Sequence, residues 1–278
     1  MGTSSIFNGQ TKSNPLLPPD YSDGDDSQVE PNAEDSNEEP NNQSGTPNID
    51  PLVPWSTVKS NFSKYINASS RGNGTSGGSL SAVARQYVRA SGGTRAIISQ
   101  AKSGLSSGKA LISLFYSLNS VGLKQTLSDL HIQFKGKGVN ELMSQLINAI
   151  SPNSVTKEDI VARKATQDAL AHIYDFMDRN GMDVNCLEKM PQNLVDEAMC
   201  AYLESYIWGL MLKDLESRIE KYESSPNKAE KIEKDLKGFT KGIVEVEFDK
   251  DKEIFKKSPA ESVVILMEKC FKAIEGIV

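Results

Sequence analysis

The feature that most constrains the fold is a long apolar stripe at helical spacing after Pro191. Apolar side chains recur there every three or four positions, at Leu194, Val195, Ala198, Met199, Tyr202, Leu203, Tyr206, Ile207, Leu210, Met211, Leu215 and Ile219. This spacing places them on one face of a helix about 45 Å long, at 1.5 Å per residue. Such a face must be buried, so we expect this helix to form the spine of the core.

Helical signals also recur on both sides of this stripe. We expect further helices near residues 80–91, 94–103, 110–118, 142–150, 156–179 and 258–274. Thr156 with Asp159 resembles a capping box, and Ser258 followed by Pro259 is a typical helix start. Only residues 243–248 alternate as a strand would, and one isolated strand has nothing to pair with. The sequence therefore predicts an all-α, multi-helix domain.

Charge divides the chain into three blocks. Residues 1–50 hold ten acids and one lysine, residues 51–128 hold nine basic residues and no acid, and residues 129–278 hold 21 basic and 27 acidic residues. The acidic block is poor in apolar residues and cannot offset the entropy of folding. We therefore predict a disordered acidic tail over 1–54, a Gly/Ser-rich linker over 55–78 and a helical domain over 79–278, made of cationic helices at 79–128 and a helical core at 129–278.

Two short apolar islands resemble each other within the acidic region. One is Asn14-Pro15-Leu16-Leu17-Pro18-Pro19, and the other is Asp50-Pro51-Leu52-Val53-Pro54-Trp55. Proline-flanked apolar residues are typical of linear motifs that dock on partner proteins, because an extended segment loses little entropy on binding. Leu16, Leu17, Leu52, Val53 and Trp55 are our candidate docking residues. The alternative is that Leu52, Val53 and Trp55 fold back onto the chain's own core.

Two glycine-rich segments look like nucleotide-binding motifs and fail on inspection. Residues 72–77 match G-x-G-x-x-G, but no apolar strand precedes them and position 97 is Ile where an acid is needed. Residues 104–110 approach a P-loop, but they place three residues between the glycines where four are needed, and Ala110 replaces the hydroxyl that binds magnesium. We expect neither segment to bind a nucleotide.

Catalytic and metal-binding residue patterns are also missing from the sequence. His131 and His172 have no cysteine or paired acid at catalytic spacing, and Cys186, Cys200 and Cys270 contain no C-x-x-C pair. We predict no catalytic residues, no metal site and no cofactor. A hydrolase that uses His172 is the least favoured alternative.

The cationic block holds the better candidates for a binding site. Arg85, Arg89, Arg95, Lys102 and Lys109 are expected on consecutive short helices. These side chains could contact phosphates of a nucleic acid or an acidic protein surface. Two simpler interpretations stay open: a solvated helix face, or an internal partner for the acidic tail.

Composition and leader patterns favour a cytoplasmic protein. The chain opens without a basic, apolar signal sequence, and its longest strongly apolar run, residues 206–212, is far shorter than the roughly 20 residues of a membrane span. Three cysteines cannot all pair, which favours a reducing compartment.

Gly2 becomes a free α-amine if Met1 is removed. Ile6 breaks the myristoylation pattern, which requires Ser or Thr at that position. An α-amine with a pKa near 8 is about a tenth deprotonated at neutral pH, whereas a lysine is deprotonated well below 0.1% of the time. Gly2 is therefore a better nucleophile than Lys12 for another acyl donor.

Several of these residues together resemble the QatB family, a component of bacterial QatABCD anti-phage systems. The resemblance rests on the Met1-Gly2-Thr3-Ser4-Ser5 opening, the two proline-flanked islands and the Gly78-to-Gly93 segment GSLSAVARQYVRASGG. It covers roughly the first 120 residues. The family pattern has a single Pro-Leu-Val-Pro-Pro-Trp-like element, whereas an acidic insert separates two versions here.

The resemblance implies a non-enzymatic defence component with three partners: a QatA-like ATPase, a QueC-like QatC protein and a TatD-like QatD nuclease. QueC-like enzymes activate a deazaguanine carboxylate with ATP, and related defence proteins look like they attach it to an N-terminal glycine. In this chain that role would belong to Gly2. The alternative is a nucleic-acid-binding adaptor that recruits the nuclease through the cationic helices.

Overall fold

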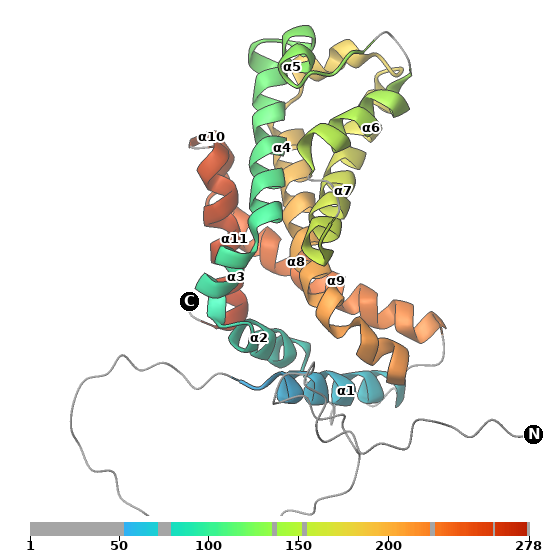
Figure 1. The fold of residues 1–278 in the computed structure, drawn as a ribbon, viewed down its shortest axis with the longest axis vertical. Helices are drawn as coiled ribbons and strands as arrows, with labels where there is room; N and C mark the ends of the chain where they lie inside the picture. The colour runs from blue at the N-terminus through green and yellow to red at the C-terminus, as the bar shows by residue number, and fades with distance from the viewer. Residues whose placement is uncertain are drawn as a thin grey trace, which may run out of the picture. The chain divides into compact units, whose positions relative to one another are not determined.

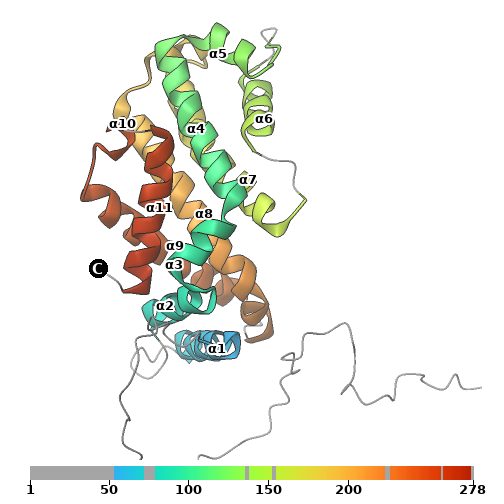
Figure 2. The ribbon, with the colours of Figure 1, turned by 60° about the vertical axis from the view of Figure 1, so that its left-hand side comes forward.

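The computed structural model describes residues 53–71, 79–134, 138–151, 155–222, 226–257 and 259–276. Every regular element in these ranges is helical, and none is a strand, which confirms the all-α prediction (Figures 1 and 2). The helices are α1 (Trp55–Arg71), α2 (Leu80–Ala90), α3 (Gly93–Gln100), α4 (Lys102–Ser120), α5 (Leu123–Asp129), α6 (Val139–Ile150), α7 (Lys157–Arg179), η2 (Val184–Lys189), α8 (Gln192–Tyr222), α9 (Pro226–Asp249), α10 (Ile254–Lys257) and α11 (Pro259–Glu275).

Helix α8 is the spine that the apolar stripe predicts. Its most extensive contacts are with α7 and α9, and it also packs against α1 and α4 (Figure 1). Tyr202, Leu203, Tyr206 and Ile207 of the stripe are fully buried. Of the helices in the described ranges, none combines the length and the apolarity that a bilayer crossing requires.

Helix α7 begins where the sequence predicts. The hydroxyl of Thr156 accepts a hydrogen bond from the Asp159 backbone N–H at 3.1 Å, and the Asp159 carboxylate accepts one from the Thr156 N–H at 2.7 Å. This capping box satisfies two backbone donors that the first turn of a helix cannot pair internally.

Two glycines of α4 allow that helix to approach α8 and α11 closely. A Cβ atom on Gly104 would lie 2.1 Å from Cζ of Tyr206, and one on Gly108 would lie 2.7 Å from Cγ1 of Val263 and 2.8 Å from Cε1 of Tyr202. Only glycine leaves room for these side chains at the crossing. The P-loop-like segment is thus a helix-packing motif, which agrees with its rejection as a phosphate loop.

The predicted linker over residues 55–78 is wrong for most of its length. Residues 55–71 form α1, and its buried residues Val58, Phe62 and Ile66 recur every four positions and join the main core. The intervening Ser, Asn and Lys residues resemble a linker in composition, but they belong to an amphipathic helix. Residues 72–78 lie outside the described part of the chain.

Candidate functional site

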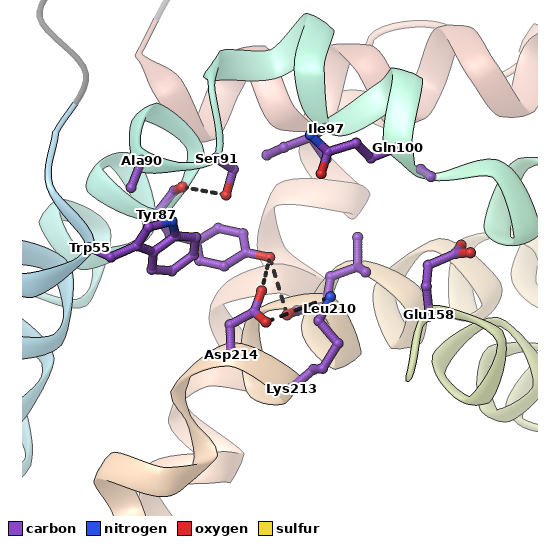
Figure 3. A pocket seen from close by; sticks show the side chains of 11 residues that line it. Trp55, Tyr87, Ala90, Ser91, Ile97, Gln100, Glu158, Leu210, Lys213 and Asp214 are labelled. Atoms are coloured by element: carbon purple, nitrogen blue, oxygen red, sulfur yellow. Dashed lines mark hydrogen bonds and ion pairs between the residues drawn. The ribbon is translucent and has the colours of Figure 1, made fainter. Parts of the chain in front are cut away.

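A cavity of about 440 Å³ opens where the start of α1 meets α2, α3, α7 and α8 (Figure 3). Trp55 of α1 and Tyr87 of α2 contribute the aromatic part of its wall. Glu158 of α7 and the pair Lys213 and Asp214 of α8 contribute the charged part. Five helices therefore supply the groups of one mostly polar cavity.

Tyr87 is the most deeply buried polar group of this cavity. Its hydroxyl has two acceptors at 3.1 Å, the backbone oxygen of Leu210 and the Asp214 carboxylate (Figure 3). Burial raises the pKa of Tyr87 well above its usual value, and the negative charge of Asp214 raises it further. Tyr87 therefore keeps its proton at neutral pH and ties α2 to α8 as a hydrogen-bond donor.

Trp55 contacts Tyr87 edge-on, with ring centroids 5.5 Å apart and planes at 81°. Aromatic pairs favour this geometry. Val53 and Trp55 both pack against the main core. The sequence left open whether Val53 and Trp55 dock on a partner protein or fold back onto the chain's own core. The structure shows that these two residues fold back onto the core. Trp55 fixes the start of α1 beside the cavity.

Glu158 occupies the N-terminal end of α4. Its carboxylate accepts hydrogen bonds from the backbone N–H groups of Ser103, at 3.1 Å, and Gly104, at 2.7 Å, and from the Tyr206 hydroxyl at 2.7 Å. Burial and the bond to Glu158 both raise the pKa of Tyr206. A helix N-terminus attracts anions, and here the chain's own carboxylate already fills that position.

Asp159, like Glu158, is a carboxylate of α7 that accepts a hydrogen bond from α4. Its carboxylate accepts a hydrogen bond from the Ser103 hydroxyl at 2.5 Å, in addition to the bonds of the capping box. These bonds, led by the one from Ser103, lower the pKa of Asp159 to about 2. Asp159 is therefore a charged acceptor that joins α4 to α7.

The five cationic candidates all lie on the surface of α2, α3 and α4. Arg85, Arg89, Arg95, Lys102 and Lys109 are exposed. No ion pair involves any of them within the described ranges, whereas several lysines further along the chain are paired: Lys164 with Asp168, Lys241 with Glu245, Lys250 with Glu247, Lys252 with Asp249, Lys256 with Glu253 and Lys272 with Glu268. The difference follows from the sequence, because residues 51–128 contain no acid.

The histidines and cysteines are not grouped in the described part of the chain. His131 and His172 are exposed on different segments, and nowhere in the described ranges do three or more His, Cys, Asp or Glu side chains gather as metal ligands would. Burial raises the pKa of Cys200 to about 12 and also raises that of Cys270. Both thiols therefore stay protonated at neutral pH.

Four of the candidate residues cannot be placed. Gly2, Leu16, Leu17 and Leu52 lie outside the described residues. Conversely, sequence reasoning missed the cavity around Tyr87 and Asp214. The two residues are 127 positions apart, and no local spacing indicates a contact over that separation. The only local sequence signal for this contact was the acid Asp214 close to the apolar stripe of α8.

Comparison with known proteins identifies the family of the chain. No curated protein and no solved structure shows a significant match to the chain. A family model, described as the Qat anti-phage system associated protein QatB, matches residues 92–274. This region runs from the start of α3 nearly to the end of α11, and it overlaps the first 120 residues, which suggested the resemblance, only from residue 92 onward. Because the match spans well over half of the sequence, the chain belongs to the QatB family of Qat anti-phage system associated proteins.

Proposed function

We propose that this chain is a non-catalytic partner protein of a Qat anti-phage system and that a QueC-like enzyme conjugates a deazaguanine-type group to its Gly2. The helical body would hold the chain within the complex, with QatA-like, QatC-like and possibly QatD-like proteins as partners. The chemistry would belong to the QueC-like partner, as it belongs to a cofactor in other systems.

The observation that carries this proposal is that buried and half-buried polar side chains of the helical domain form hydrogen bonds between helices. Tyr87 bonds α2 to α8, and Glu158 bonds α7 to α4 and α8. Glu275 of α11 likewise accepts bonds from the N–H and the hydroxyl of Thr94 in α3, at 3.2 and 2.6 Å. Groups that are held in this way stabilise helix packing and are poorly placed to move protons. The body therefore supports a scaffold better than an active site.

The start of α1 gives the N-terminal segment a defined point of attachment. Val53 and Trp55 pack against the core, and Trp55 contacts Tyr87 of α2, so the described part of the chain begins at a fixed place. Once Met1 is removed, the α-amine of Gly2 is a far better nucleophile at neutral pH than Lys12. Both features favour a role in which the folded body carries the N-terminal segment to an enzyme.

Intact-mass spectrometry after co-expression with the genomic neighbours tests the proposal. We expect an added mass that maps to Gly2 and requires the QueC-like protein. An N-terminal tag should abolish both the added mass and phage defence, while the same tag at the C-terminus should spare both. An unmodified N-terminus in a defence-competent strain would refute the proposal.

A second candidate function is nucleic-acid binding by α2, α3 and α4. The observation that favours it is that five exposed cations of these helices have no ion-pair partner in the described ranges. Arg85→Glu with Arg89→Glu should abolish a DNA mobility shift at low salt, since phosphate contacts dominate such binding. Lys228→Glu with Lys231→Glu on α9 is the matched control, because it makes the same change in net charge. A purified chain that causes no shift at low salt excludes this function.

A further inference from the structure

A second hollow, of about 320 Å³, lies between α7 and α8. Its α7 wall consists of Lys157, Ile160, Val161 and Lys164, which follow the i, i+3, i+4, i+7 spacing of a single helix face. We call this hollow the α7/α8 groove. Ile160 is 57% exposed, so the middle of this wall is apolar surface in contact with water, with a lysine at either end.

The α8 wall has the same i, i+3, i+4, i+7 spacing, beginning at Ser205. Trp208, Gly209 and Leu212 line it. A Cβ atom on Gly209 would lie 2.8 Å from Cγ1 of Val161, so this glycine lets the two helices approach and places Val161 at the bottom of the groove. Each helix therefore presents one apolar stripe to the same hollow, as two helices of a bundle do where a third helix packs.

The charge around the groove differs from that of the chain around it. Residues 129–278 hold 21 basic and 27 acidic residues, yet the groove is lined by Lys157, Lys164 and Lys213 and by a single acid, Glu216. Lys164 is paired with Asp168 and Lys213 with Asp214, while no ion pair involves Lys157 in the described ranges. Lys157, at one end of the apolar centre, is therefore the lysine of this lining whose charge is left to attract an acidic group on whatever binds there.

We infer that the α7/α8 groove binds an amphipathic helix of a partner protein, with apolar residues at i, i+3, i+4 and i+7 and acidic residues beside them. The α7 lining from Lys157 to Lys164 spans about 10 Å and the α8 lining from Ser205 to Glu216 about 16 Å at 1.5 Å per residue, which corresponds to two to three turns of a bound helix. This binding site is separate from Gly2 and does not depend on the proposed conjugation.

Fluorescence anisotropy with designed peptides tests the inference on the full chain. The probe is a fluorescein-labelled 14-residue helical peptide with leucines at i, i+3, i+4 and i+7 and glutamates beside them. Its control has lysines in place of the glutamates. We expect the glutamate peptide to bind about two- to fivefold more tightly, because the control places a like charge against Lys157, whose own charge is unpaired in the described ranges.

Two variants locate the site. Ile160→Asp should weaken binding of the glutamate peptide at least about tenfold, because it puts a carboxylate in the centre of the apolar surface. Val246→Asp on α9 is the matched control: Val246 is 56% exposed and does not line the groove. It should leave binding unchanged. Both positions are more than half exposed, and circular dichroism checks that both variants fold.

Three results would overturn the inference. They are the absence of binding, equal binding of the two peptides, and equal loss in the two variants. A fourth comes from sedimentation velocity: if the chain is a dimer that Ile160→Asp converts to a monomer, then a second copy occupies the groove and the partner helix does not.

Discussion

Gly104→Ala tests whether the P-loop-like segment is a packing motif. The new Cβ would lie 2.1 Å from Cζ of Tyr206. Tyr206 is fully buried, and its hydroxyl is held by Glu158 at 2.7 Å, so the ring cannot move without breaking that bond. Overpacking of this kind costs about 3 kcal/mol, while alanine returns about 1 kcal/mol of helix propensity. We expect a net loss of about 2 kcal/mol.

Urea unfolding followed by circular dichroism measures this loss, and a thermal scan should show a fall of roughly 4–8 °C for a domain of this size. Gly238→Ala is the matched control. Gly238 lies inside α9, and nothing lies within 4 Å of an added Cβ there. Its replacement should raise stability by about 0.5–1 kcal/mol.

A double variant separates overpacking from any other effect of the methyl group. Tyr206→Ala removes the ring that the new Cβ would strike, so Gly104→Ala should cost much less in that background. If Gly104→Ala leaves the free energy of unfolding unchanged or raises it, the close approach of α4 and α8 is wrong and the glycines need another explanation.

Three further predictions concern single side chains. Because the pKa of Asp159 falls from 3.8 to about 2 on folding, its stabilising effect should be complete above about pH 4 and lost as the pH falls toward 2; Asp159→Asn should flatten the unfolding free energy over that range. Tyr87→Phe should cost about 1–2 kcal/mol in urea unfolding, because Asp214 and the Leu210 carbonyl lose their donor. Cys186 and Cys200 are both half-buried, but desolvation raises the pKa of Cys200 to about 12, so a maleimide at pH 8 should label Cys186 first; equal labelling rates in mass spectrometry would contradict this order.

The parts of the fold that the sequence predicted are those that local spacing decides. The stripe of α8 is long enough that its period cannot be mistaken, and the start of α7 is a capping box within four residues, Thr156 to Asp159. Helix α1 was missed because it has few fully buried apolar residues, Val58, Phe62 and Ile66. Its remaining residues have the composition of a linker, and composition says nothing about tertiary packing.

The cavity around Tyr87 could not be predicted from local sequence patterns, for a different reason. Its groups come from five helices, and their contacts depend on how α1 packs against α2 and α8. Likewise, the spacing at residues 104–110 excludes a P-loop, but the sequence alone does not explain why Gly104 and Gly108 are glycines. That reason is the position of Tyr202 and Tyr206 on another helix, about 100 residues later.

Gly2, the cationic helices and the α7/α8 groove lie in separate parts of the chain, so their roles can be tested one at a time in a phage-defence assay. Gly2→Pro, Arg85→Glu with Arg89→Glu, and Ile160→Asp each change one feature, and the last two replace exposed side chains whose loss leaves the core intact. If only the first abolishes defence, conjugation at the N-terminus is the chain's essential contribution. If Ile160→Asp also abolishes defence while the mass added at Gly2 persists, then binding at the groove serves a step other than modification. If the added mass disappears as well, the groove holds the partner that modifies Gly2.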